Sequence, residues 1–283
     1  MLVRGETRRI EGTLVMGVVN ASPESFSDAG RFRSLDDRLE LAAGLVDAGA
    51  DVVDVGGQSA ITNQPEIDAA EEIERVVPII EWLHARYPDL LISVDTYKPP
   101  VAEAALRAGA AIVNDVSGLL YPEIADLCAA HHAALVVMHT VARPKVRMQD
   151  PTLYDDVARE VVEFLADRIR LAVSRGLPET SLIVDPGPDF SKTPYQTVAV
   201  LRRLDEVRAL GRPVLLALSR KDFLGAVTGR SPRGRDAATN AAIGYFATTP
   251  GNLVRVHDVA AARDVIATVE LLAGRRDLDP GYL

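Results

Sequence analysis

The feature that most constrains the fold is a short apolar run that recurs about eight times and ends each time in polar residues or a turn. The clearest copy is LIVDPG at 182–187, in which apolar residues lead to Asp185 and a Pro-Gly turn. A run of this length, bounded by a turn, is typical of a strand that is buried on both faces. The other runs lie at residues 14–19, 52–55, 90–94, 111–113, 135–138, 214–218 and 253–256.

Amphipathic helical patterns separate these runs. Strands that alternate with helices indicate βαβ units and a parallel sheet, and eight such units favour closure into a barrel of about 250 residues. A doubly wound open sheet is the alternative, but it would need only five or six strands and often carries a G-x-G-x-x-G turn, which the sequence lacks. We therefore predict an α/β fold, a single (β/α)8 TIM barrel that forms one domain over 1–283. Helices are expected at about 36–48, 66–86, 99–109, 122–132, 152–175, 195–210, 235–247 and 259–273.

Charge and composition narrow the possible partners. The chain has 283 residues, a net charge of −9 and a pI of about 5.1, which disfavours binding to nucleic acid or to an anionic membrane. No apolar run approaches 18 residues, and the first residues lack the apolar core of a signal peptide, so no membrane span or leader is expected. Cys128 is the single cysteine, so no intrachain disulfide can form, as fits a reducing, cytoplasmic location.

In a barrel, the carboxyl ends of all strands meet at one mouth, where enzymes of this fold carry their active sites. Side chains that are far apart in the sequence are therefore expected to converge there. The candidates at the predicted strand ends are Asn20, Asp95, Asn114, Asp185, Lys221, Arg255 and His257.

The acceptor groups among these residues suit a ligand with several N–H donors. Two carboxylates, Asp95 and Asp185, and the amide of Asn114 could bind the amino-pyrimidinone edge of a pterin, because a carboxylate can make two parallel hydrogen bonds to such an edge. The alternative is that these aspartates cap nearby helices or pair with Lys or Arg.

The basic groups suit phosphate. Arg255 and His257 are two apart on one strand and point to the same side, so with Asn20 they could bind phosphate or pyrophosphate. A purely structural histidine is the alternative. Lys221 could bind a ring carbonyl or phosphate or form a Schiff base, or it could be solvated at the start of a helix.

Taken together and in order, the motifs resemble those of dihydropteroate synthase, the pterin-binding barrel enzyme of folate synthesis, over about residues 13–273. VNASPESFSD at 19–28 is similar to the family's first loop, and DVGGQS at 54–59 to the start of its second. The remaining matches are SVDT at 93–96, VNDV at 113–116, DPG at 185–187 with Phe190, SRK at 219–221 and RVHD at 255–258.

This family joins a pterin-CH₂-pyrophosphate to p-aminobenzoate, releases pyrophosphate and uses Mg²⁺. The resemblance implies the same transferase activity, substrates and metal, and a homodimer formed through late helices. It implies that Asp95, Asp185 and Lys221 are catalytic and hold the pterin together with Asn114 and Met138.

The other implied roles concern the metal, the leaving group and the second substrate. Asn20 would help bind Mg²⁺ and pyrophosphate, while Arg255 would lie beside the pterin and bind the leaving group with His257. Phe190 and Ser219, with the helix that follows, would receive p-aminobenzoate.

The chain departs from the family in the outer part of this site. AITN at 60–63 replaces the usual Thr-Arg-Pro-Gly, so Ile61 stands where an Arg would help bind pyrophosphate, and Gln58 replaces a usual Glu. Asp189 replaces a Gly, and Ala217 replaces a common Gly. Divergent paralogues of the synthase known in actinobacteria are similar in this respect.

Asp222 stands where the family often has Ser. At about 4 Å and an effective dielectric near 20, its charge would oppose the p-aminobenzoate carboxylate by about 4 kcal/mol. Alternatively, Asp222 caps the helix that it begins and points away.

Several functions therefore stay open from the sequence. One is a working synthase, and another is a pterin-binding paralogue with another acceptor or no reaction, because of Ile61 and Asp222. A pterin-dependent methyltransferase barrel would need a separate cobalamin partner. An aldolase-type enzyme would use Lys221 as its Schiff-base residue.

Overall fold

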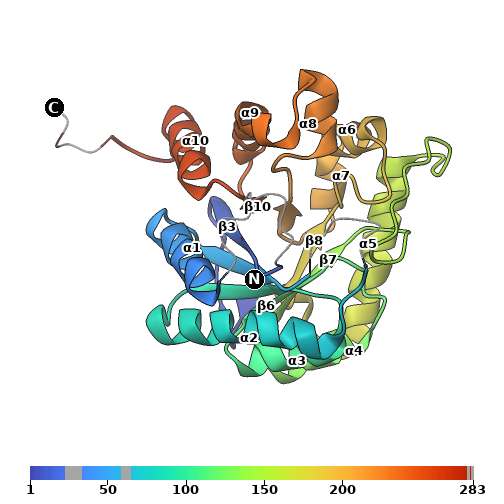
Figure 1. Ribbon diagram of the computed structural model, residues 1–283. Helices are drawn as coiled ribbons and strands as arrows, with labels where there is room; N and C mark the ends of the chain where they lie inside the picture. The colour runs from blue at the N-terminus through green and yellow to red at the C-terminus, as the bar shows by residue number, and fades with distance from the viewer. Residues whose placement is uncertain (23–33, 59–64, 279–280, 282–283) are drawn as a thin grey trace.

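The predicted strands close into one parallel barrel in the computed structural model of the protein, which describes residues 1–22, 34–58, 65–278 and 281 (Figure 1). Neighbouring strands follow the order β10-β3-β4-β5-β6-β7-β8-β9, and β10 pairs with β3 to complete the circle. The prediction of a (β/α)8 TIM barrel is confirmed, and the doubly wound alternative is wrong. The strands are β3 (Thr13–Asn20), β4 (Val52–Gly56), β5 (Leu91–Asp95), β6 (Ile112–Asp115), β7 (Ala134–Met138), β8 (Leu182–Asp185), β9 (Val214–Leu216) and β10 (Asn252–Val256).

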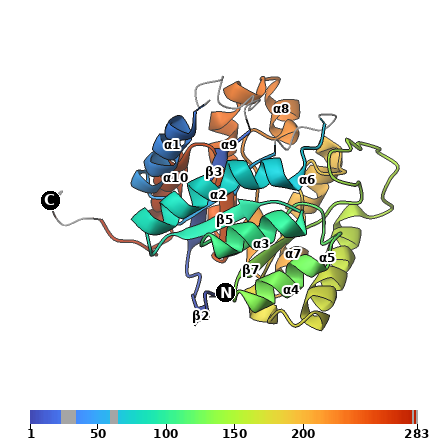
Figure 2. The same cartoon turned by 60° about the horizontal axis from the view of Figure 1, so that its bottom comes forward.

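Helices surround the barrel, as Figure 1 shows from one end. Figure 2 shows α2, α3 and α4 side by side over one flank, where α3 contacts both of its neighbours. The helices are α1 (Leu35–Asp47), α2 (Ala69–Arg86), α3 (Pro99–Arg107), α4 (Glu123–Ala130), α5 (Val157–Ser174), α6 (Pro194–Arg202), α7 (Leu204–Arg208), α8 (Asp222–Thr228), α9 (Asp236–Ala247) and α10 (Val259–Leu272).

Local capping chemistry sets several helix boundaries. The helix expected at about 152–175 begins only at Val157, because the Asp156 side chain accepts a hydrogen bond from the N–H of Arg159 and caps α5. The helix expected at about 195–210 divides at Arg203, whose φ of −111° separates α6 from α7.

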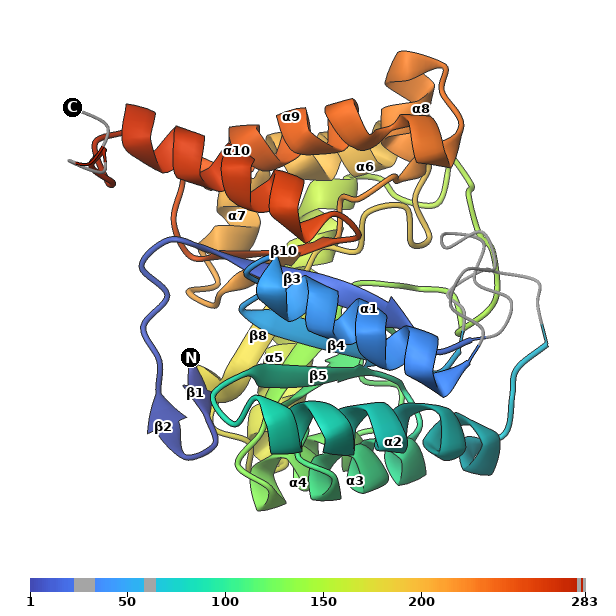
Figure 3. The same ribbon diagram turned by 60° about the vertical axis from the view of Figure 1, so that its left-hand side comes forward.

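The sequence patterns did not predict the hairpin of β1 (Leu2–Val3) and β2 (Glu6–Thr7). Its turn, Arg4–Gly5, has positive φ at both residues, which suits a tight two-residue hairpin. Arg4 joins the hairpin to the barrel, since its N–H donates to the carbonyl of His132 at 2.8 Å and its guanidinium to that of Pro88 at 2.8 Å. Figure 3 shows the hairpin at the end of the barrel away from α8.

The apolar interior has two parts. One lies between the strands and the surrounding helices and includes Cys128 of α4, whose fully buried Sγ lies 3.9 Å from the carbonyl oxygen of Ala134. The other fills the barrel itself. Its buried members include Met16, Val52, Leu91, Ile112, Val136, Ile183, Leu215 and Leu253.

The alternation of side chains along each strand determines what lies above this inner core. Leu91 is inside, so Asp95, four residues later on β5, also faces the barrel interior. On β10, Leu253 is inside, so Arg255, two residues later, also faces the barrel interior. The strand register aligns Gly56, Asp95 and Asn114 across β4, β5 and β6. The inner face therefore changes from apolar at the base to polar at the mouth.

Candidate active site

Arg255 is the centre of a network of polar side chains that crosses the mouth of the barrel. Its Nε lies 2.7 Å from Asp54 Oδ2, and its Nη2 lies 2.8 Å from Asp95 Oδ2. The buried amide of Asn114 donates to the same Asp54 oxygen at 3.1 Å. In the sequence, Asp54 stood out only as part of the DVGGQS motif at 54–59. The feature that could have marked Asp54 as a site residue is the presence of a carboxylate inside an otherwise apolar run.

Burial makes the charge on this network sensitive to pH. It raises the pKa of Asp95 to about 7, an effect that the Arg255 guanidinium opposes and the Asp54 carboxylate reinforces. For Arg255 itself, burial lowers the pKa, but the carboxylates of Asp54 and Asp95 outweigh it and hold the pKa above its usual value. A bound ligand with N–H donors would compete with Arg255 for Asp95.

Asp185 is the last residue of β8 and lies at the mouth of the barrel. Its side chain is buried, and burial raises its pKa to about 6, although a hydrogen bond from the N–H of Gly187 at 2.7 Å opposes the shift. Met138 of β7 is buried and pairs with Asp185 in the strand register. Gly187 has a φ of +65°, and a Cβ there would overlap the carbonyl oxygen of His139, so glycine alone suits this turn.

A buried lysine that sequence analysis did not single out holds the loop after β8. The Nζ of Lys192 lies 3.0 Å from the carbonyl oxygen of Gly187, 3.1 Å from that of Phe190 and 2.7 Å from His139 Nδ1. These three acceptors match the three donors of an ammonium group. Burial lowers the pKa of Lys192 to about 7, and burial next to Lys192 lowers that of His139 to about 2, so the imidazole is neutral.

A cavity of about 340 Å³ opens outward from the mouth. Of the residues predicted for the site, Asp95, Phe190 and Lys221 line it; the others, from Asn20 to His257, lie outside its lining. The residues that line it include Gln58, Thr140, Arg143, Lys145, Arg147, Met148, Asp189, Ser191, Arg220 and Asp222.

An aromatic platform forms one wall of this cavity. The Nζ of Lys221 lies 4.4 Å from the ring centroid of Phe190, within cation–π range. Burial lowers the pKa of Lys221. Nearby, the hydroxyl of Ser219 and Nδ1 of His257 are 2.9 Å apart, so Ser219 and His257 are joined directly at the ends of β9 and β10.

The two unusual aspartates meet at the start of α8. Asp189 has a φ of +64°, the conformation that explains why the family prefers glycine there and that Asp tolerates better than most residues. Its Oδ2 accepts from the N–H of Asp222 at 2.5 Å, and its Oδ1 accepts from the Thr197 hydroxyl at 3.1 Å. Asp189 therefore caps α8, and Asp222 does not.

Two arginines offset the charge of Asp222. Its Oδ1 lies 3.1 Å from Arg235 Nη1, and its Oδ2 lies 3.6 Å from Arg147 Nη2. The repulsion expected between Asp222 and an acceptor carboxylate is therefore reduced, because Asp222 is not an isolated charge.

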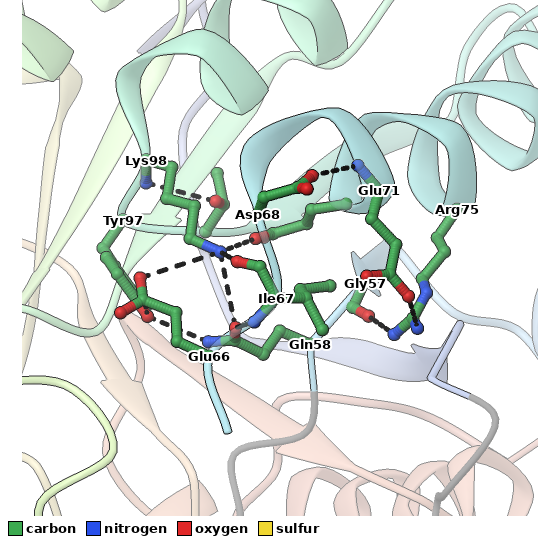
Figure 4. Close-up of polar contacts among 11 residues, drawn as sticks. Gly57, Gln58, Glu66, Ile67, Asp68, Glu71, Arg75, Tyr97 and Lys98 are labelled. Carbon is green, nitrogen blue, oxygen red and sulfur yellow. Dashed lines mark hydrogen bonds and ion pairs between the residues drawn. The ribbon is translucent and has the colours of Figure 1, made fainter. Parts of the chain in front are cut away.

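Gln58 belongs to a polar cluster beside the cavity (Figure 4). Its Oε1 accepts from the N–H of Ile67 at 3.0 Å, and its Nε2 donates to the Tyr97 hydroxyl at 2.9 Å. Lys98 stands against this cluster, with its Nζ 2.8 Å from Glu72 and 3.4 Å from Gln58 Oε1. Gln58 thus connects the end of β4 to the segment that leads into α2. Ile61, the other departure predicted in this segment, lies outside the described residues.

The region near Asn20 could take part in binding a hydrated metal. Asn20 is half-buried at the carboxyl end of β3. Among the described residues, no three His, Cys, Asp or Glu side chains gather closely enough to hold a metal ion. The side-chain oxygen of Asn20 is a hard oxygen ligand, the kind of protein group that Mg²⁺ accepts beside its waters and a substrate's phosphates.

The barrel and its acidic, amide-bearing mouth define a pterin-binding enzyme, and the family model described as "Pterin binding enzyme" matches residues 16–257. The chain belongs to the dihydropteroate synthase family of transferases. It is 39% identical to dihydropteroate synthase of Streptococcus pyogenes, over 93% of this chain and 97% of the relative.

Two further comparisons agree. The chain is 42% identical, over 94% of its length, to a probable bifunctional folylpolyglutamate synthase/dihydropteroate synthase of Haloferax volcanii, but it spans only 31% of that longer protein. A solved structure of Xanthomonas albilineans dihydropteroate synthase with 4-aminobenzoic acid has a TM-score of 0.86 and 38% identity, and the match covers 95% of this chain and 96% of that one.

Proposed function

We propose that the protein condenses a 6-hydroxymethyl-7,8-dihydropterin pyrophosphate with p-aminobenzoate and releases pyrophosphate, as a dihydropteroate synthase. The observation that carries the proposal is the set of acceptors at the carboxyl ends of strands β5, β6 and β8, which meet at one mouth of the barrel: Asp95, Asn114 and Asp185. Such a group complements the N–H donors of a pterin. Membership of the synthase family supports the same assignment.

Binding and bond cleavage are assigned to different residues. Asp185 and Asn114 would hold the pterin over Met138, and Asp95 would take part once Arg255 releases it. As the C–O bond to pyrophosphate breaks, positive charge develops on the pterin methylene, and the carboxylates of Asp95 and Asp185 stabilise it. The amine nitrogen of the acceptor then bonds to that carbon and loses its proton.

The departing pyrophosphate needs cations. Arg255, a cation, and His257, as a hydrogen-bond donor, are assigned to it, and Asn20 would help to hold Mg²⁺. When bound, Mg²⁺ neutralises charge on the leaving group. Lys221, at the cavity wall, would bind the pterin's ring carbonyl or the phosphate. Its ammonium lies over one face of the Phe190 ring, so the acceptor's ring would pack on the other face.

The experiment that tests this proposal is a turnover assay. Purified protein with Mg²⁺, the pterin pyrophosphate and p-aminobenzoate is expected to release pyrophosphate and form dihydropteroate. The absence of pyrophosphate release above background would reject the proposal. A borohydride trap with carbonyl substrates gives a separate check, since an adduct on Lys221 would instead support the aldolase-type alternative.

A second candidate is a paralogue that binds the pterin but uses another acceptor or performs no reaction. The meeting of Asp189 and Asp222 at the start of α8 favours it, because both carboxylates lie on the cavity wall. Pterin binding without p-aminobenzoate binding in calorimetry would support this candidate over the synthase.

We also propose a homodimer formed through the late helices. Exposed apolar residues on three of them support it: Val227 on α8, Tyr245 on α9 and Leu272 on α10. Sedimentation of the purified protein would test it. A cytoplasmic location is proposed from the single cysteine. None of the helices in the described part of the chain is long and apolar enough to cross a membrane.

A further inference from the structure

The loop between β7 and α5 brings three cations to the cavity, and one of them, Arg147, lies beside Asp222 at the start of α8. Arg143, Lys145 and Arg147 all line it. The loop is tied to the β8 loop, since the N–H of Ala142 donates to the hydroxyl of Ser191 at 3.0 Å. It is tied to α6 as well, because Gln196 donates to the carbonyl of Asp150 at 3.0 Å. These anchors fix the backbone at both ends of the segment that carries the three cations.

The start of α8 offers little to an incoming carboxylate. The first N–H of this seven-residue helix, that of Asp222, already donates to Asp189. The side chain of Asp222 is held by Arg235, whose side chain is only 11% exposed and whose guanidinium also donates to the carbonyls of Arg220 and Lys221 at 2.9 and 3.0 Å. The guanidinium of Arg235 thus makes its contacts within the protein.

Arg147 is held differently. Its side chain is 56% exposed, its Nη2 lies 3.6 Å from Asp222 and it donates to Gln149 at 3.0 Å. Exposed ion pairs of this kind contribute only about 0–1 kcal/mol, so a ligand carboxylate can replace Asp222 as the partner of Arg147. Arginine can bind such a carboxylate through two parallel hydrogen bonds.

We propose that Arg147 binds the carboxylate of the acceptor in this protein, in place of the first turn of α8. The inference rests on the proposed function and specifies its second substrate site. The acceptor's ring would lie against Phe190, with its amine directed into the barrel and its carboxylate outward to Arg147. Asp222 then remains paired with Arg235 while the acceptor is bound.

The test uses two acceptors that share a ring and an amine but differ in charge, p-aminobenzoate and p-aminobenzamide. In Arg147→Gln, the KM for p-aminobenzoate should rise about 10- to 100-fold, the range set by losing charge-assisted hydrogen bonds. The KM values for p-aminobenzamide and for the pterin should stay unchanged. The control is Arg159→Gln, an exposed arginine of α5 outside the cavity, which should alter none of these constants.

The proposal is overturned if Arg147→Gln leaves the KM for p-aminobenzoate within threefold, or raises it equally for both acceptors. If the unaltered protein has no turnover, calorimetry with p-aminobenzoate in the presence of a pterin and pyrophosphate replaces the assay. Binding that Arg147→Gln weakens at least tenfold would support the subsite even though the synthase function had failed. An unaltered protein that binds no p-aminobenzoate would overturn both.

Discussion

The inner and outer parts of the site are built in opposite ways. The inner part is a set of side chains from strand ends, fixed by the barrel and connected through Arg255 to Asp54 and Asp95. The outer part consists of loops and the start of α8, where Asp222 is shared between Arg147 and Arg235. Strand-borne groups keep a family's common chemistry, whereas loop-borne groups can change partners without disturbing the barrel. Two departures from the family pattern that fall on described residues, Asp189 and Asp222, lie in the outer part.

The largest expected effect is in the inner part. Asp185→Asn removes a buried carboxylate, and we expect kcat/KM for the pterin to fall about 100- to 1,000-fold, because charge-assisted hydrogen bonds contribute about 1.5–3 kcal/mol each. Steady-state kinetics would measure it. The matched control is Asp156→Asn, which removes a carboxylate away from the cavity while asparagine can still cap α5, and which should leave the kinetics unchanged. A fall of less than tenfold would show that Asp185 does not bind the pterin.

The loop after β8 joins the inner and outer parts of the site, and its conformation depends on Lys192. In Lys192→Met, two carbonyls and an imidazole lose their shared donor, and we expect the free energy of unfolding to fall by about 2–4 kcal/mol. Urea unfolding would measure this change. Affinity for p-aminobenzoate should also fall, since Asp189 and Phe190 lie on the loop that Lys192 holds. Lys145→Met serves as the stability control, and an equal loss of stability in both variants would contradict the role of Lys192.

The pH dependence should report on the inner part. Burial raises the pKa of Asp95 to about 7 and that of Asp185 to about 6, so both carboxylates become protonated as the pH falls below those values. The protonated forms bind donors poorly, and kcat/KM for the pterin should therefore fall about tenfold or more between pH 7 and pH 5. A pH–rate profile that is flat over this range would contradict the assignment.

The smallest expected effect is in the outer part. Asp222→Ser frees Arg147 but leaves Arg235 bonded to the carbonyls of Arg220 and Lys221, so the KM for p-aminobenzoate should fall only about two- to fivefold. A gain of a hundredfold would instead mean that Asp222 acts as an unpaired repulsive charge, which is one of the two alternatives that the sequence left open. The KM for the pterin serves as the internal control.

The fold was predictable because apolar runs and helical stripes alternate along the whole chain, and the convergence at the mouth follows from closure of the barrel. Lys192 was not predictable from local pattern, because its burial depends on the path of the loop after Gly187. The pairing of Asp222 was not predictable either. Its two arginines come from separate segments, and only the folded chain shows that Asp189 takes the cap of α8. Sequence patterns locate strand ends well and loop partners poorly.

The single cysteine provides a built-in reporter of local opening. Cys128 is fully enclosed between α4 and the barrel, and burial raises the pKa of its thiol, so the native chain presents almost no reactive thiolate. Labelling by a thiol reagent would then proceed only when α4 detaches from β7. The labelling rate would be followed with and without a bound pterin. The difference would measure how far ligand binding at the barrel mouth suppresses local opening of α4.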